Sequence, residues 1–174
     1  TPKSVQIYKQ TAQVYGSASV TSSPAGAEIF YSYNGAAWAP LNLNTNQTNI
    51  TGLPAGSWKV KLVKSGYNDW ESTAKTLLSG GSISFYGAMV PLASVTSNPT
   101  GAEIYYSYNG TAWAPLNLNT NQVNIAGLPV GTYRGKLVKA GYQDWTSTTT
   151  KTLSAGGQPL SFDGTLVSPY GSAS

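Results

Sequence analysis

Apolar and polar side chains alternate along much of the chain with a period of two, which is typical of half-buried β-strands. Residues 27–33 carry apolar side chains at every odd position, and Glu28 lies on the opposite face. Residues 58–62 alternate in the same way, with Lys59 and Lys61 between the apolar positions. No stretch shows a convincing helical stripe. The pattern predicts an all-β protein.

Turn signals separate these segments. The dipeptides Asn34-Gly35 and Asn109-Gly110 favour type I′ turns, which need positive φ at both central residues. Gly- or Pro-containing turns divide the rest of the first unit at residues 24–26, 53–56 and 79–81. Short strands between regular turns predict a small antiparallel, Ig-like β-sandwich of about six or seven strands in each unit.

The chain contains a tandem repeat. Residues 19–70 align with residues 94–145 at an offset of 75 without a gap, and 13 of these 52 positions differ. We therefore expect two tandem β-sandwiches with an N-terminal strand-like arm. The expected divisions are residues 1–18 for the arm, 19–92 for repeat 1, 93–168 for repeat 2, and 169–174 for the start of a linker to a further repeat.

The two ends of the chain carry a second repetition. Residues 15–19, which lead into repeat 1, reappear as residues 170–174. We therefore hypothesise that the chain is a slice of a longer repeat array. Residues 4–8 and 12–15 alternate polar and apolar side chains, so the arm has strand character. Because sandwich edges expose unpaired backbone groups, the arm is a candidate for strand addition to a neighbouring copy. The competing interpretations are that the arm completes the first sandwich of its own chain or belongs to an upstream domain of a longer array.

The alternation also predicts which side chains form the core. One set is expected to be buried in both repeats, at Ile29, Ile104, Leu62, Leu137, Tyr67 and Tyr142. The lysines on the opposite face are expected to be exposed, at Lys61 and Lys136.

The motif order resembles that of the PEGA domain, twice over. A segment S-P-x-G-A-E-I-Y/F is followed by a Gly-containing turn, then G-L-P-x-G and finally K-x-G-Y-x-D-W. The most specific positions are Pro24, Gly26, Ala27, Gly52 to Gly56, Gly66 and Tyr67, and their counterparts Pro99, Gly101, Ala102, Gly127 to Gly131, Gly141 and Tyr142. The resemblance implies a β-sandwich module, often repeated, on microbial surface or envelope proteins and without catalytic residues of its own.

Composition narrows the function further. Only 9% of the residues are charged, against about 25% in an ordinary soluble domain. The net charge is +4 and the basic residues are scattered, so we expect no nucleic-acid partner. No apolar run approaches the roughly 18 residues that indicate a transmembrane helix, so no transmembrane segment is expected.

Catalytic and metal chemistry have few residues to use. The chain has no Cys and no His, so nucleophile–base pairs that depend on them are excluded. Glu28 is expected to be a solvated residue rather than an acid or base. The acidic run at residues 68–71 lacks the spacing of a Ca²⁺ loop. We therefore expect no enzyme, no catalytic or metal-binding residue and no cofactor.

Aromatic residues beside the Asn-Gly turns are candidates for stacking on a glycan: Tyr33, Trp38, Tyr108 and Trp113. The competing interpretation is cross-strand aromatic packing that stabilises the hairpin. The sequence favours the packing interpretation but leaves both open.

Three asparagines lie in N-glycosylation acceptor patterns: Asn46, Asn49 and Asn109. In an exported protein such sites lie on surface loops, and Asn46 falls in a predicted exposed loop. The second repeat loses the first two patterns.

The sequence therefore predicts a non-catalytic structural or interaction module at the cell surface or outside the cell. Duplication without divergence preserves a shape rather than a unique pocket, as in a filament, sheath, S-layer or stalk. The expected partner is a further copy of the same chain or repeat, with a cell-surface glycan as a second candidate. The alternative function is a carbohydrate-binding module that uses the surface aromatics.

Overall fold

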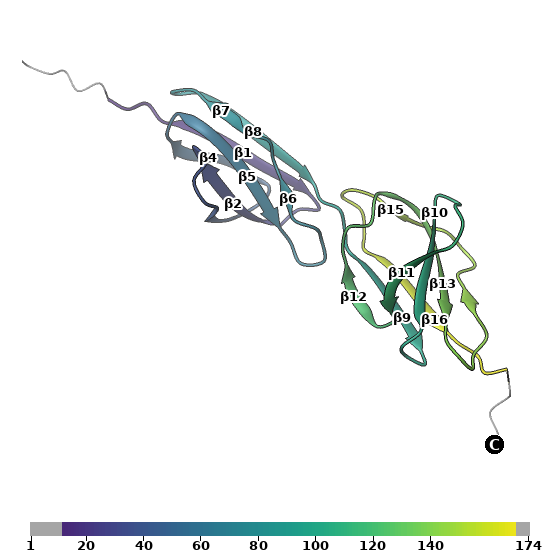
Figure 1. The fold of residues 1–174 in the computed structure, drawn as a ribbon. Helices are drawn as coiled ribbons and strands as arrows, with labels where there is room; N and C mark the ends of the chain where they lie inside the picture. Colours follow the sequence, from purple (N-terminus) through teal and green to yellow (C-terminus); the bar gives the residue numbers. More distant parts are fainter. Residues whose placement is uncertain (1–11, 170–174) are drawn as a thin grey trace, which may run out of the picture.

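The computed structural model of the protein describes residues 12–169. Within that range the chain forms strands, turns and bends without a helix. It folds into two β-sandwiches that lie end to end (Figure 1). The predicted all-β tandem sandwich is confirmed.

Each repeat contains eight strands in the described part of the chain. In repeat 1 they are β1 (Gly16–Ser23), β2 (Glu28–Tyr33), β3 (Ala39–Asn44), β4 (Gln47–Leu53), β5 (Gly56–Val63), β6 (Trp70–Glu71), β7 (Lys75–Leu77) and β8 (Ser82–Ala88). In repeat 2 they are β9 (Ala93–Asn98), β10 (Glu103–Tyr108), β11 (Ala114–Asn119), β12 (Gln122–Ile125), β13 (Gly131–Val138), β14 (Trp145–Thr146), β15 (Lys151–Leu153) and β16 (Leu160–Thr165).

Two sheets face each other in each repeat. In repeat 1 a three-stranded sheet has the order β4-β1-β8, and a five-stranded sheet has the order β3-β2-β5-β6 with β7 also paired to β5. Repeat 2 has the same arrangement in β12-β9-β16 and β11-β10-β13-β14, with β15 paired to β13. The first and last strands of each repeat pair in parallel, unlike the expected antiparallel pairing. A parallel pair needs a long connection, and here the intervening strands of the repeat provide it.

The core lies between the two sheets, and the strand alternation sets its composition. Ile29 and Leu62 are at most 1% exposed, and Ile104 and Leu137 at most 3%, as predicted. Burying such a side chain contributes about 1.5–3 kcal/mol. These side chains come from β2, β5 and their counterparts β10 and β13, so the five-stranded sheet presents its other face to solvent.

Asn residues make many of the sharp bends. At the predicted type I′ turn, Asn34 has φ 50° and Gly35 has φ 78°, and the Ala36 N–H donates to the Tyr33 carbonyl at 3.0 Å. The matched turn at residues 109–110 has φ values of 47° and 78°. Other Asn residues with positive φ recur in pairs at positions 42 and 117, 46 and 121, and 49 and 124. Asn tolerates this left-handed conformation better than most residues, which explains the Asn-rich segment.

Some side chains differ from the prediction. Tyr67 and Tyr142 are half-buried rather than buried, because they lie near the end of each sandwich and not between its sheets. Lys61 and Lys136 lie on the outer face as expected, but their side chains are only 25% and 28% exposed. Each ammonium group folds back onto an aromatic ring and a carboxylate.

The N-terminal arm differs as well. Residues 12–15 form no strand, and the first strand begins at Gly16. The alternating segment at residues 4–8 lies outside the described residues. The proposed strand character of the arm therefore has no support in its described part.

Candidate functional surface

The outer face of the five-stranded sheet carries Lys59 and Lys61 and some of the aromatic side chains of repeat 1. Lys59 and Lys61 project from β5 on the side away from the core. The Lys59 Nζ lies 5.3 Å from the centre of the Trp38 ring, and the Lys61 Nζ lies 5.8 Å from that of Phe30. Both distances are within the range of a cation–π contact. The lysines thus cover the aromatic rings that flank them.

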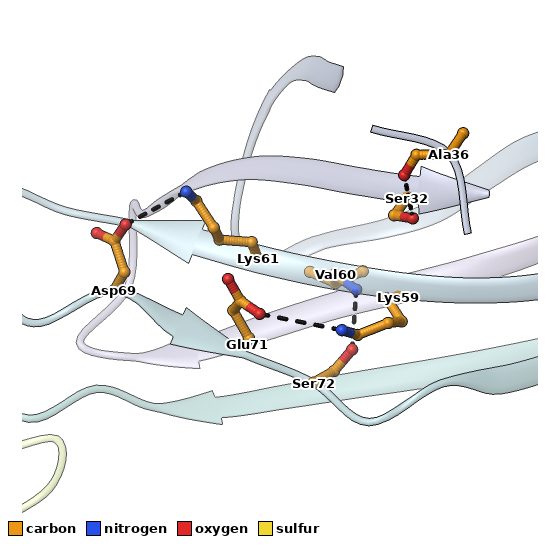
Figure 2. Close-up of polar contacts among 8 residues, drawn as sticks. All are labelled: Ser32, Ala36, Lys59, Val60, Lys61, Asp69, Glu71 and Ser72. Carbon is orange, nitrogen blue, oxygen red and sulfur yellow. Dashed lines mark hydrogen bonds and ion pairs between the residues drawn. The ribbon is translucent and has the colours of Figure 1, made fainter. Parts of the chain in front are cut away.

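Acidic side chains neutralise these lysines. The Lys61 Nζ lies 3.4 Å from Asp69, just before β6, and the Lys59 Nζ lies 3.9 Å from Glu71 in β6 (Figure 2). The Asp69 and Glu71 side chains are about half exposed, so solvent screens both pairs and each stabilises the fold by about 0–1 kcal/mol. We call this row of lysines and carboxylates on the outer face the outer ladder. In repeat 1 its charges balance, so the surface there is close to electrically neutral.

Repeat 2 reproduces the face with one partner changed. Lys136 pairs with Asp144 at 2.9 Å and lies over Tyr105. Arg134 lies 5.8 Å from the centre of the Trp113 ring. Since Thr146 stands where repeat 1 has Glu71, the Arg134 guanidinium donates instead to the Ser147 carbonyl at 3.0 Å.

A groove opens beside this ladder where β3 bends away from β2. Residues 41–43 lie between the pairs Glu28–Asn44 and Phe30–Pro40, opposite a single residue of β2. The groove has a volume of about 340 Å³ and is lined chiefly by Glu28, Phe30, Pro40, Asn42, Leu43 and Asn44. Its counterpart in repeat 2 measures about 280 Å³. Each groove combines one carboxylate, two carboxamides and an aromatic ring, a set that can hydrogen-bond and stack against a polar ring.

Two of the four candidate glycan-stacking residues lie at the rim of the core instead. The Tyr33 ring centre is 4.8 Å from that of Trp58, and its hydroxyl donates to the Ala55 carbonyl at 2.9 Å. Gly56 allows this contact because a Cβ there would lie 2.5 Å from the Tyr33 ring. Tyr108 holds the Val130 carbonyl in the same way at 3.0 Å. Both tyrosines therefore anchor the Gly-Leu-Pro turn.

The other two candidates remain on the surface. Trp38 is half-buried under Lys59, and Trp113 is 39% exposed. The sequence could not distinguish them from the tyrosines, since all four flank the same turns. Their position relative to the sheet depends on the loop between the turn and β3.

The three glycosylation candidates are exposed, and each has positive φ. The Asn46 Oδ1 accepts the Ser22 N–H at 3.3 Å, and the Asn109 Oδ1 accepts the Thr132 N–H at 2.9 Å. Repeat 2 keeps the asparagines at positions 121 and 124 although it loses the acceptor patterns. Backbone geometry is thus a sufficient reason for these asparagines, and glycosylation of Asn46, Asn49 and Asn109 stays a prediction.

The described residues offer no metal centre and no membrane helix. Among residues 12–169, no three carboxylate, His or Cys side chains come together to hold an ion. The same range has no helix long and apolar enough to cross a membrane. Burial raises the pKa of Tyr133 to about 12, with smaller contributions from Tyr108 and Tyr106. This phenol lies in the core, where it donates to the Pro129 carbonyl at 2.6 Å.

No protein-family model and no curated protein matches the chain. Solved structures that it resembles include the TIE protein of Bacillus anthracis, with 15% identity and a TM-score of 0.35, over 89% of this chain and 34% of that one. The minor pilin GBS52 of Streptococcus agalactiae has 12% identity and a TM-score of 0.32, over 88% of this chain and 96% of the pilin. The shaft pilin SpaA of Lactobacillus rhamnosus GG has 12% identity and a TM-score of 0.25, over 88% and 98%.

The chain thus spans about a third of the length of the TIE protein. At these identities the similarity concerns the fold alone. The resemblance to PEGA domains rests on the sequence motifs, and no family model supports it.

Proposed function

We propose that the chain is a non-catalytic structural module of a microbial cell-surface or extracellular assembly, such as a filament, sheath, S-layer or stalk. The observation that carries this proposal is the direct junction between two sandwiches with the same fold (Figure 1), which backbone and side-chain hydrogen bonds cross. A module that preserves its shape through duplication is suited to bearing load or setting a spacing.

The connection between the sandwiches is short and anchored. Only residues 89–92 separate β8 from β9, and Met89 and Pro91 are almost fully buried. The Leu92 N–H donates to the Gly66 carbonyl at 2.8 Å. A buried linker of this length restricts bending between the repeats, in contrast to a flexible Gly/Ser linker.

The surface chemistry supports the same proposal. On the outer face Lys59, Lys61 and Lys136 are paired with carboxylates, and most polar surface comes from uncharged side chains. The chain offers no thiol or imidazole for catalysis. The six side-chain carboxylates are spread over the two repeats, and Asp69, Glu71 and Asp144 are each paired with a lysine.

Localisation of the native protein tests this function. An antibody raised against the folded chain should label the cell surface or an extracellular structure in electron micrographs of the source cells. Pre-absorption with the purified chain provides the control. Labelling confined to the cell interior would contradict the proposal.

The second candidate, carbohydrate binding, is favoured by the paired grooves and the surface tryptophans. A glycan array with the full chain should then show binding that Trp38→Ala and Trp113→Ala weaken together. Asn42→Ala separates a contribution of the groove from that of the tryptophan. Tyr86, which is 61% exposed and lies on the other sheet, provides a matched exposed-aromatic control as Tyr86→Ala. Binding lost in all variants alike would point to a general effect on folding.

Modification of the surface is part of the proposal. Mass spectrometry of native peptides should detect hexose-containing adducts on Asn46, Asn49 or Asn109. Unmodified peptides at all three positions would remove this part and leave the structural role intact.

Strand addition by the N-terminal arm is a separate proposal for self-association. Deleting residues 1–16 should abolish polymerisation if the arm supplies the strand. A truncated chain that still polymerises would exclude it.

A further inference from the structure

The inner junction has two complementary halves. The first is a socket at the end of repeat 1, formed by Ser23, Tyr67, Met89 and Val90. The second is a Gly loop in repeat 2, formed by residues 154–157. The Gly156 N–H donates to the Met89 carbonyl at 2.7 Å, the Tyr67 hydroxyl donates to the Gly157 carbonyl at 3.1 Å, and the Ser23 hydroxyl donates to the Gly156 carbonyl at 3.4 Å.

The loop can approach the socket because Gly156 lacks a side chain. Gly156 has φ +74°, and a Cβ at this position would lie 2.6 Å from the Ser23 Oγ. An L-residue is both strained at this φ and too close to the socket. The glycine at 156 is thus explained by the contact with repeat 1.

The Gly loop recurs at the far end of repeat 1, in residues 78–81. The Gly81 N–H donates to the Leu78 carbonyl at 2.9 Å, as the Gly157 N–H does to the Ser154 carbonyl at 3.0 Å. At this end, the segment just before β1 takes the place of Met89, since the Ser79 hydroxyl donates to the Val14 carbonyl at 3.0 Å. Among the described residues, no tyrosine contacts this loop in the way that Tyr67 contacts the inner one.

The socket recurs at the far end of repeat 2, with the same backbone hydrogen bonds. The Leu166 N–H donates to the Asn98 carbonyl at 2.8 Å, as the Met89 N–H donates to the Ser23 carbonyl at 3.0 Å. The Tyr142 N–H donates to the Lys139 carbonyl at 3.1 Å, as the Tyr67 N–H donates to the Lys64 carbonyl at 3.1 Å. Tyr142 therefore holds the position of Tyr67, but within residues 12–169 no Gly loop faces it.

Apolar side chains that the inner junction covers are open at the two ends. Met89 is fully buried and Val90 is packed against the core of repeat 2. At the end of repeat 2, Leu166 matches Met89 and is also buried, whereas Val167, which matches Val90, is 60% exposed. Before repeat 1, Val14 is 57% and Tyr15 is 54% exposed. Each end of the described range, residues 12–169, thus exposes apolar side chains beside one half of the inner junction.

We propose that these two ends bind one another between copies of this chain, in a head-to-tail contact that repeats the inner junction. The Tyr142 hydroxyl of one copy donates to the Gly81 carbonyl of the next, as a second donor beside the Ser17 N–H of that chain, which lies 3.0 Å away. The Asn98 amide, which stands where repeat 1 has Ser23, donates to the Gly80 carbonyl. Because the two halves differ, the contact leaves a free half at each end and extends into a linear array. This inference rests on the proposed structural function and names its partner surface.

The contact is small, so association of free chains is expected to be weak. Sedimentation velocity and small-angle X-ray scattering of the full chain, from micromolar to millimolar concentration, should show mass increasing with concentration. The particles should lengthen while their cross-section stays constant. Tyr142→Phe should weaken association about five-fold, which corresponds to the loss of one hydrogen bond.

Tyr67→Phe is the matched control, because it removes the same hydroxyl from the inner junction and should leave the association constant unchanged. Gly80→Val should block association, whereas Gly110→Val should not, since Gly110 has a similar φ of +78° and no neighbour near its Cβ. A chain that stays monomeric throughout, growth in width, or equal association of the wild type and Tyr142→Phe would each overturn the inference. None of these outcomes bears on surface localisation, so the proposed function is tested separately.

Discussion

Repeat 1 and repeat 2 fill the same core position with different rings. Trp58 in β5 donates its indole N–H to the Pro54 carbonyl at 3.1 Å. Tyr133 in β13 donates its hydroxyl to the Pro129 carbonyl at 2.6 Å. The same turn is therefore anchored by two side chains of different size and chemistry. The comparison shows that the hydrogen bond to the proline carbonyl is retained while the ring is not.

A neighbouring substitution accompanies the exchange. Gly135 stands in β13 where repeat 1 has Val60. A Cβ at Gly135 would lie 3.2 Å from the Phe162 ring, so the packing there is close. A glycine inside a strand weakens it, and the serine contact to the backbone is kept at both positions. The Val60 N–H donates to the Ser72 hydroxyl oxygen at 2.8 Å (Figure 2), and the Gly135 N–H to that of Ser147 at 3.1 Å.

The largest expected effect tests whether the two cores are equivalent. Leu62→Ala and Leu137→Ala should each destabilise their own repeat by about 2–5 kcal/mol, because both side chains are fully buried and leave a cavity. Hydrogen exchange measured residue by residue separates the two repeats. A loss below roughly half a kilocalorie in either repeat would show that its core packing differs from the other.

The next effect tests the serine contacts that both repeats share. Ser72→Ala and Ser147→Ala should each cost about 1–3 kcal/mol, since a buried backbone N–H loses its acceptor. Chemical denaturation of the two variants should give similar losses. Thr73→Ala, at an exposed neighbouring position, controls for substitution in this loop, and its stability should match that of the wild type.

The ionisation of Tyr133 should make the stability of the two repeats differ at high pH, because Trp58, its counterpart in repeat 1, does not ionise. Burial raises the pKa of Tyr133 from 10.0 to about 12, so the folded state holds this proton more tightly than the unfolded state. The stabilisation is complete below pH 10 and is lost as the pH rises to about 12. Repeat 2 should therefore lose more stability than repeat 1 over this range.

Tyr133→Phe checks the assignment. At neutral pH it should cost about 0.5–1.5 kcal/mol through the lost hydrogen bond to Pro129. It should also remove the additional alkaline loss of repeat 2. An alkaline loss that persists in this variant would assign the titration to other tyrosines.

The smallest effect concerns the outer ladder. Asp69→Asn and Asp144→Asn should each change stability by about 0–1 kcal/mol, and the change should shrink with added salt because the pairs are solvent-exposed. The Lys136–Asp144 distance of 2.9 Å is shorter than the 3.4 Å of Lys61–Asp69. Denaturation at low and high salt should therefore show that the stability lost in Asp144→Asn shrinks more with added salt than the stability lost in Asp69→Asn.

Local sequence was sufficient to predict much of this protein. Alternation assigned Ile29 and Leu62 to the buried face and Lys61 to the outer face, because successive strand residues point to opposite sides of a sheet. The Asn34-Gly35 pair predicted its turn, because few residues adopt positive φ without strain. The internal repeat then predicted two sandwiches with the same core.

Only the tertiary structure decided which segments meet. Alternation says which face a residue occupies but not which strand pairs with it, so the parallel pairing of β1 and β8 had no local signal. The inward position of Tyr33 and the contact of Tyr67 with Gly157 depend in the same way on neighbours far along the chain. These contacts join groups that are brought together only when the sheets pack and the sandwiches stack, and they include the junction on which the proposed assembly rests.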